Sequence, residues 1–158
     1  MFSQAGLTEF SNLSPEAGAF VFDAIDFGMY SLDIDDGPDA SFTPFAMIQP
    51  VDDGPEILRL FDDETHPDIE RGVAMGRELL ADIDRPARYV ALGWDGYSTL
   101  SDGVRTETVF VEAYELGRTS GVLMGQRYQR FTDGIEPIGN PILLDDATTP
   151  LVPGAARR

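Results

Sequence analysis

The sequence predicts an α+β fold: an antiparallel sheet, made of a hairpin plus a three- to four-stranded meander, packed against a central helix, with an additional N-terminal helix. Three observations favour it. Two segments carry apolar residues at helical spacing, residues 88–131 hold three strand-length runs, and two shorter apolar runs flank a turn at 52–55. A chain of 158 residues suits one domain. We expect a flexible arm over residues 1–13, the domain over 14–147 and a flexible tail over 148–158.

The first helix is expected to begin at Ser14-Pro15-Glu16. Serine is a common N-cap, proline suits the first helical position, and an acid in the first turn faces the positive end of the helix dipole. Phe20, Ala24 and Phe27 follow at helical spacing. A cluster of turn-forming residues from Asp33 to Pro38 should end this helix.

A hairpin is expected next, pairing Phe45–Gln49 with Ile57–Phe61. The turn between them, Asp52-Asp53-Gly54-Pro55, is made of residues that favour reversal of the chain. Pro44 and Pro50 bound the first strand. Because proline donates no backbone hydrogen bond, this strand should be an edge or contain a bulge.

The second helix is expected to start near Thr65 or His66, before Pro67, with acids in its first turn, and to end at Arg85-Pro86. Glycines at 72 and 76 should weaken it by about 1 kcal/mol each. They lie on its apolar side, so close packing on a sheet is expected to compensate. The apolar stripe of this helix is Ile69, Val73, Gly76, Leu80 and Ile83.

Three strands are expected at Arg88–Thr99, Val104–Leu116 and Gly121–Phe131, with a short edge strand at Pro141–Leu144. Folding the first pair about Ser101-Asp102-Gly103 places Leu92 opposite Val111 and Trp94 opposite Val109. Folding the second pair places Val109 near Tyr128. One face, assigned to the second helix, then carries Val90, Leu92, Trp94, Val109, Val111, Ala113, Val122, Met124 and Tyr128.

The opposite face of this meander is the candidate binding surface. Aromatic side chains mixed with one acid and one arginine are typical of protein interfaces. Three interpretations stay open: cover by the first helix or the hairpin, a dimer interface, or a ligand groove. The candidate residues are Tyr89, Tyr97, Phe110, Glu112, Tyr114, Leu123 and Arg127.

The net charge is −17, from 11 arginines against 28 acids, with no lysine. Such a field repels nucleic acid and anionic lipid, and it attracts basic proteins or cations. A GC-rich genome or adaptation to high salt would also produce this composition. The absence of cysteine excludes disulfides, thiolate metal sites and cysteine nucleophiles. No apolar run is long enough for a membrane helix, and Met1–Phe10 does not resemble a secretory signal, so we expect a soluble, cytoplasmic protein.

The densest cluster of potential metal ligands is Asp62, Asp63, Glu64 and His66, with Asp68 following. A solvated turn before an acidic helix start explains the cluster better than a cation site. A calcium loop starting at Asp33 is rejected, because proline stands at its sixth and twelfth positions. Asp95 has no identifiable catalytic partner. We expect no metal and no cofactor.

The leading hypothesis is a non-catalytic acidic module, chaperone-like or inhibitor-like, that binds a protein partner through the aromatic sheet face. We expect a homo-oligomer, with a homodimer favoured, or a partner that is basic. One alternative is a small carboxylate- or metal-dependent enzyme using Asp62, Asp63, Glu64 and His66. Another is a small-ligand binder with a pocket between the first helix and the sheet, lined by Tyr89, Glu112 and Arg127.

Overall fold

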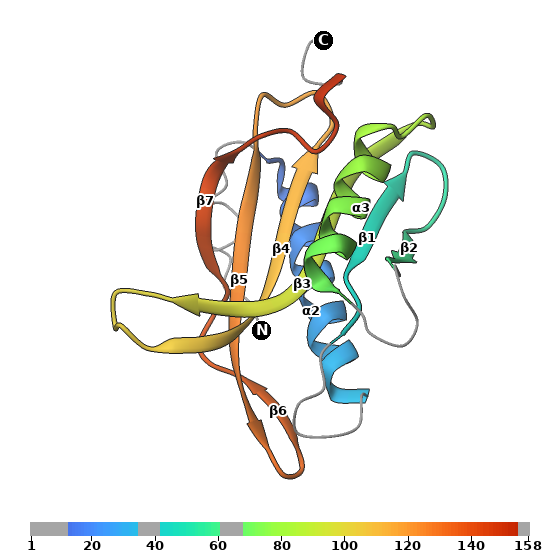
Figure 1. Ribbon diagram of the computed structural model, residues 1–158. Helices are drawn as coiled ribbons and strands as arrows, with labels where there is room; N and C mark the ends of the chain where they lie inside the picture. The colour runs from blue at the N-terminus through green and yellow to red at the C-terminus, as the bar shows by residue number, and fades with distance from the viewer. Residues whose placement is uncertain (1–12, 35–41, 61–67, 155–158) are drawn as a thin grey trace.

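The computed structural model describes residues 13–34, 42–60 and 68–154, and their fold is α+β (Figure 1). Every strand pair is antiparallel, and the sheet order is β2-β1-β3-β4-β5-β6, with β7 also pairing with β5. The elements are α2 (Pro15–Ile34), β1 (Phe45–Pro50), β2 (Glu56–Arg59), α3 (Ile69–Ala81), β3 (Ala87–Thr99), β4 (Arg105–Glu115), β5 (Gly121–Phe131), β6 (Gly134–Pro137) and β7 (Ile142–Thr148). The predicted fold class is confirmed.

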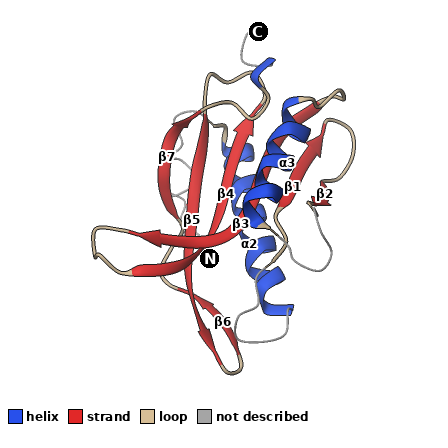
Figure 2. Cartoon of the chain, viewed as in Figure 1, coloured by secondary structure: helices blue, strands red, loops and turns tan. Residues whose placement is uncertain are grey.

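The sheet is covered on both faces, with α3 in front of it and α2 behind it (Figure 2). The α2 side forms the larger apolar cluster, in which Val21 and Ile25 of the helix meet Ala91, Val111 and Met124 of the strands. The α3 side forms a second cluster from Leu80, Val90, Leu92, Tyr114 and neighbouring residues. A sheet buried on both faces has apolar residues at consecutive strand positions.

The predicted register between β3 and β4 is wrong by one residue. Leu92 pairs with Glu112, Gly93 with Val111, and Trp94 with Phe110. The predicted inward face therefore divides, because a shift of one residue moves a whole strand to the other side of the sheet. Its β3 members (Val90, Leu92 and Trp94) lie on the α3 side, whereas its β4 and β5 members (Val109, Val111, Ala113, Val122, Met124 and Tyr128) lie on the α2 side.

The β4–β5 register is wrong by two residues, which leaves the grouping of the β4 and β5 residues with one another intact. Val109 pairs with Gln126 rather than lying near Tyr128, and Val111 pairs with Met124. A slip of two residues is one full period of the strand, so these side chains stay together on one side of the sheet, although that is the α2 side and not the predicted side under the second helix.

Both helices begin at a residue whose side chain caps the first turn. The Ser14 hydroxyl accepts a hydrogen bond from Ala17 N at 3.2 Å, which confirms the predicted cap of α2. Ser14 N and Oγ both donate to the carboxylate of Glu115, at 2.7 and 2.9 Å, and so fix the helix start to the end of β4. In α3 the N-cap is Asp68, whose side chain accepts from Arg71 N. The residues predicted for that start, Thr65 and His66, lie outside the described part of the chain.

The glycines of α3 let the helix lie close to the sheet, as expected. A Cβ at Gly72 would approach Pro44 Cγ to 2.9 Å. A Cβ at Gly76 would overlap Leu92 and approach Leu60 Cδ1 to 2.7 Å. Glycine lowers the helix propensity at these two positions, and the close packing of α3 on the sheet that it permits offsets this loss.

The predicted first hairpin is present, but its first strand is not an edge. β1 lies between β2 and β3, and the edge strand is β2. Pro50 ends β1 where its register with β3 becomes irregular, so the sheet loses few hydrogen bonds to it. Pro44 precedes the strand, and its carbonyl accepts from Leu60 N at 2.8 Å.

Near the C-terminus the sheet is larger than predicted. β6 pairs with the far end of β5, and the predicted short strand extends to Thr148 as β7. Leu151 and Val152 fall within the predicted flexible tail, yet both are buried in the α3-side cluster. Of the predicted N-terminal arm the structure describes Leu13, which is also buried.

Candidate functional site

The seven candidate binding residues do not share one face. Phe110, Glu112, Tyr114, Leu123 and Arg127 lie together on the α3 side. The β3 register shift removes Tyr89 and Tyr97 from this group. Tyr89 packs on Phe20 of α2 with ring centroids 5.4 Å apart, and Tyr97 is 53% exposed with the Arg105 guanidinium 3.8 Å from its ring centre. The predicted continuous surface is therefore reduced to its β4 and β5 members, and these lie on the α3 side, whereas the prediction placed them on the face opposite the second helix.

Tyr114 serves the core rather than a surface. Its side chain is buried, and its hydroxyl donates to the carbonyl oxygen of Arg118 at 2.6 Å. Burial raises the pKa of Tyr114 above its usual value. A residue with its ring covered and its hydroxyl paired within the fold offers nothing to a partner.

Two charged pairs border the same face. The buried carboxylate of Glu112 accepts from Arg77 of α3 at 2.7 Å. Arg127 donates through one terminal nitrogen to Asp102 and to the Thr106 hydroxyl, each at 2.8 Å. A backbone hydrogen bond from Val104, and then the contact with Arg127, hold the pKa of Asp102 below its ordinary value. Each acid thus has an arginine beside it.

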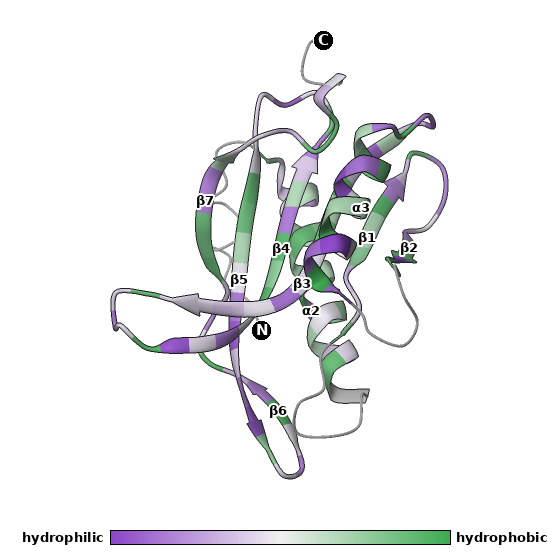
Figure 3. Ribbon diagram, viewed as in Figure 1, coloured by the Kyte–Doolittle hydropathy of each residue, from purple (hydrophilic) through white to green (hydrophobic). Residues whose placement is uncertain are grey.

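Between these pairs lies a half-buried apolar surface that we call the aromatic ledge, formed by Trp94, Phe110, Leu123 and Leu144. The rings of Trp94 and Phe110 are stacked, with centroids 5.6 Å apart and planes 19° apart. Two glycines make room for it: a Cβ at Gly96 would approach Phe110 Cε2 to 3.0 Å, and one at Gly125 would approach Leu144 Cδ1 to 2.9 Å. Figure 3 shows hydrophobic colouring on β5 and on part of β7 here.

Trp94 lies on the side of the second helix, as predicted, whereas Phe110 and Leu123 of the ledge were predicted on the opposite face. Gly93 and Gly96 do not mark a bulge, because β3 pairs with β4 without interruption from Tyr89 to Thr99. The glycines instead accommodate rings on opposite faces, Phe45 over Gly93 and Phe110 over Gly96.

A polar network lies on the α2 side, where the sequence indicated Asp95 alone. The Tyr128 hydroxyl donates to Asp95 Oδ1 at 2.7 Å and lies 3.4 Å from Glu107. Arg130 Nε donates to both carboxylate oxygens of Glu107, at 2.9 and 3.0 Å, and its terminal nitrogen lies 3.2 Å from the Tyr128 hydroxyl. Burial, followed by the hydrogen bond to Asp95, raises the pKa of Tyr128. The network unites three strands and holds Tyr128 protonated.

Substituting Tyr128 by phenylalanine should change how the free energy of unfolding depends on pH. Because the folded pKa lies above the unfolded value near 10, the stability that Tyr128 contributes is complete below about pH 10 and is lost above it. We expect the variant to lose about 1–2 kcal/mol at neutral pH, since Asp95 loses a donor. Above about pH 10 its free energy of unfolding should fall less steeply, by up to about 1.4 kcal/mol per pH unit. Urea unfolding from neutral pH to about pH 11 measures both, and Tyr97→Phe, at an exposed tyrosine, should leave the slope unchanged.

The structure tests the predicted ligand pocket but does not describe the residues of the predicted metal site. Tyr89 and Glu112 lie on opposite faces of the sheet, so the pocket proposed to use them with Arg127 is wrong. The proposed metal ligands Asp62, Asp63, Glu64 and His66 lie outside the described residues, and Asp68 caps α3. Within the described ranges, no group of three or more histidine or acidic side chains could hold a metal ion.

Comparison with known proteins adds no relative: no family model, no curated protein and no solved structure matches the chain. No helix in the described part of the chain is long and apolar enough to cross a membrane.

Proposed function

We propose that this chain is a non-catalytic, acidic protein-interaction module that associates with a second copy of itself through the aromatic ledge. The observation that carries the proposal is the stacked Trp94–Phe110 pair, which is half-buried on the α3 side, whereas Val90, Leu92 and Tyr114 on the same side are buried. Aromatic residues in partly covered apolar surfaces are the residue class that anchors protein interfaces.

Charge at the ledge favours a second copy as the occupant. A net charge of −17 opposes self-association at long range, yet Glu112 and Asp102, two of the acids beside the ledge, form ion pairs with Arg77 and Arg127. An isologous contact would therefore place neutral pairs, rather than unmatched carboxylates, against each other. Screening of the remaining repulsion should make the association stronger as salt is raised.

We propose that the chain acts in the cytoplasm. Proteins of this reducing compartment rarely contain disulfides, which agrees with the absence of cysteine from the sequence. In this setting the module would act by occupying or presenting a surface, in the manner of a chaperone or an inhibitor. Self-association would present two identical acidic surfaces to a partner.

Sedimentation velocity across a wide range of concentration tests the proposal. We expect the mass to rise from 17.3 kDa towards twice that value for the unmodified chain. Phe110→Asp should stay at the monomer mass, because it places a charge in the centre of the contact. Leu144→Asp, a second ledge variant, should behave in the same way if Phe110→Asp fails to fold.

The matched control is Phe131→Asp, which makes the same change at an aromatic residue that is 49% exposed and outside the ledge. It should keep the dimer. A chain that remains monomeric at every concentration contradicts the proposal, as does a control that dissociates as readily as the ledge variants.

A further inference from the structure

An open pocket of about 710 Å³ lies at the end of the sheet where α3 finishes and β3 begins. It is separate from the aromatic ledge and shares no residue with it. Four stretches of the chain converge there. The lining residues are Val51, Ala81, Ile83, Asp84, Arg85, Pro86, Ala87, Leu116, Gly117, Val152 and Gly154.

The floor of the pocket is apolar. Val152 belongs to the α3-side core cluster, and Ile83 and Leu116 pack against that cluster while remaining partly exposed. Ala81 and Ala87 add small side chains that leave space above them. An apolar side chain that entered the pocket would therefore extend the core and be withdrawn from water.

The walls are held by backbone hydrogen bonds. Val51 N donates to the Pro86 carbonyl at 3.4 Å, and Leu116 N donates to the Arg88 carbonyl at 3.1 Å. The end of α3 is closed by the bond from Ile83 N to the Leu80 carbonyl at 3.3 Å. A pocket whose walls are already fixed loses little conformational entropy when it is filled.

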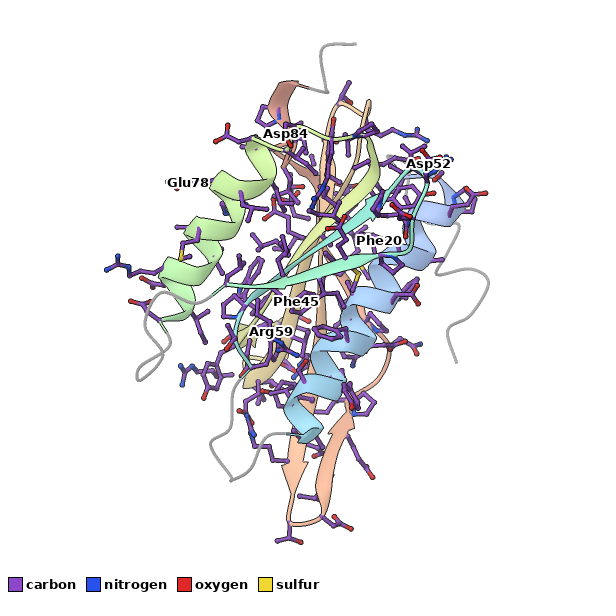
Figure 4. All side chains as sticks on the ribbon, turned by 90° about the vertical axis from the view of Figure 1, so that its right-hand side faces the viewer. Phe20, Phe45, Asp52, Arg59, Glu78 and Asp84 are labelled. Atoms are coloured by element: carbon purple, nitrogen blue, oxygen red, sulfur yellow. The ribbon has the colours of Figure 1, made fainter. Side chains whose placement is uncertain are left out.

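The rim is acidic. Asp84 lines the pocket, and the exposed Asp82 and Asp52 are sequence neighbours of lining residues. Two exposed arginines also adjoin the lining, Arg88 and Arg118, and Arg118 forms an ion pair with Glu115. Figure 4 shows Asp84 and Asp52 at the same end of the molecule. The lining cation, Arg85, forms an ion pair with Glu56 at 3.1 Å. The carboxylates give a negative electrostatic potential around the apolar floor, and this potential attracts and orients cations.

We propose that this pocket binds a basic segment of a partner protein, with one aliphatic or aromatic side chain in the cavity and flanking lysines or arginines against the rim. The apolar floor and the acidic rim would act together: the floor provides affinity for the apolar side chain, and the carboxylates select a segment with positive flanking charge. A second copy of this chain, with its charge of −17, would add negative charge to the carboxylates at this rim, so it is not the occupant that we propose here. The inference does not depend on self-association.

The probe is a short fluorescein-labelled peptide that alternates leucine and tryptophan with lysine and arginine, and its partner is the same peptide with glutamate at every basic position. Fluorescence anisotropy should show saturable binding of the basic peptide that weakens with salt, and no binding of the acidic one. Amide shifts in the nuclear magnetic resonance spectrum should gather on residues 81–87 and on Leu116, Gly117 and Val152. If the basic peptide does not bind, or if shifts centre on the ledge, the inference is wrong.

Two matched pairs of variants separate a specific site from general attraction. Ala81→Trp fills the pocket and should weaken binding at least about tenfold, whereas Ala74→Trp, at an exposed α3 position that does not line it, should not. Asp84→Asn should weaken binding about two- to fivefold, whereas Asp145→Asn, which changes the net charge equally on β7, should have no effect. Equal effects within either pair would overturn the proposal, and the result is independent of the ledge variants.

Discussion

Replacing Gly93 by alanine should lower the free energy of unfolding by about 2–3 kcal/mol, although alanine is intrinsically the better strand residue. Gly93 pairs directly with Phe45 across β3 and β1. A Cβ there would overlap the Phe45 ring, coming within 2.5 Å of Cε2. The ring cannot retreat, because Phe45 is fully buried with Phe27 at 4.9 Å and Phe42 at 5.8 Å between centroids. Chemical denaturation measures the change.

The control for this prediction is Gly54→Ala. A Cβ at Gly54 would meet nothing within 4 Å, so the same change of residue there should alter stability by less than about 0.5 kcal/mol. A Gly93→Ala variant as stable as the control would mean that Phe45 does not cover Gly93.

Truncating Leu80 to alanine should cost about 2–5 kcal/mol, because its side chain is fully buried between α3 and the sheet. The neighbouring Leu79 is 39% exposed, and Leu79→Ala should cost less than about 1 kcal/mol. Thermal or urea unfolding of the two variants gives the comparison. Equal losses would show that α3 does not present Leu80 to the sheet.

The elements that the sequence predicts well are those with local causes. Ser14-Pro15-Glu16 starts a helix through its own side chains, and the hairpin follows from the turn at 52–55. The glycine stripe of α3 indicates close packing because a helix keeps its periodicity whatever it packs against. None of these depends on a distant partner.

The β3–β4 register depends on the parity of one loop, and the sequence does not determine that parity. Thr99 pairs with Arg105, so five residues lie between them, whereas the predicted pairing of Trp94 with Val109 implies an even number. Gly103 N bonds the Leu100 carbonyl at 2.9 Å, and Gly103 has a φ of +74°, which a glycine adopts freely. Val104 then adds the extra residue.

Alternation of apolar and polar residues could not correct this error. From Val90 to Gly93 every residue of β3 is buried, because α2 covers one face and α3 the other. A strand buried on both sides gives no parity signal. The wrong grouping of Tyr89, Tyr97 and Trp94 with residues of β4 and β5 follows directly. Phe110, Leu123 and Arg127 stay together because their strands slipped by a full period.

The polar network and the pocket had weaker signals still. Glu107, Tyr128 and Arg130 are ordinary strand residues until the register brings them beside Asp95. The pocket forms where four stretches of the chain meet, and one of its lining residues, Val152, belongs to a segment that the sequence predicts to be a flexible tail. Such sites are properties of the assembled fold rather than of any motif.

The central claim is that the sheet is buried on both sides, with Leu92 facing α3 and Val111 facing α2. A double-mutant cycle for stability tests it most directly, combining Leu80→Ala with Leu92→Ala and, separately, with Val111→Ala. We expect the first pair to be non-additive by at least about 0.5 kcal/mol, and the second to add within about 0.3–0.5 kcal/mol. Coupling of Leu80 to Val111 rather than to Leu92 would contradict the structure described above.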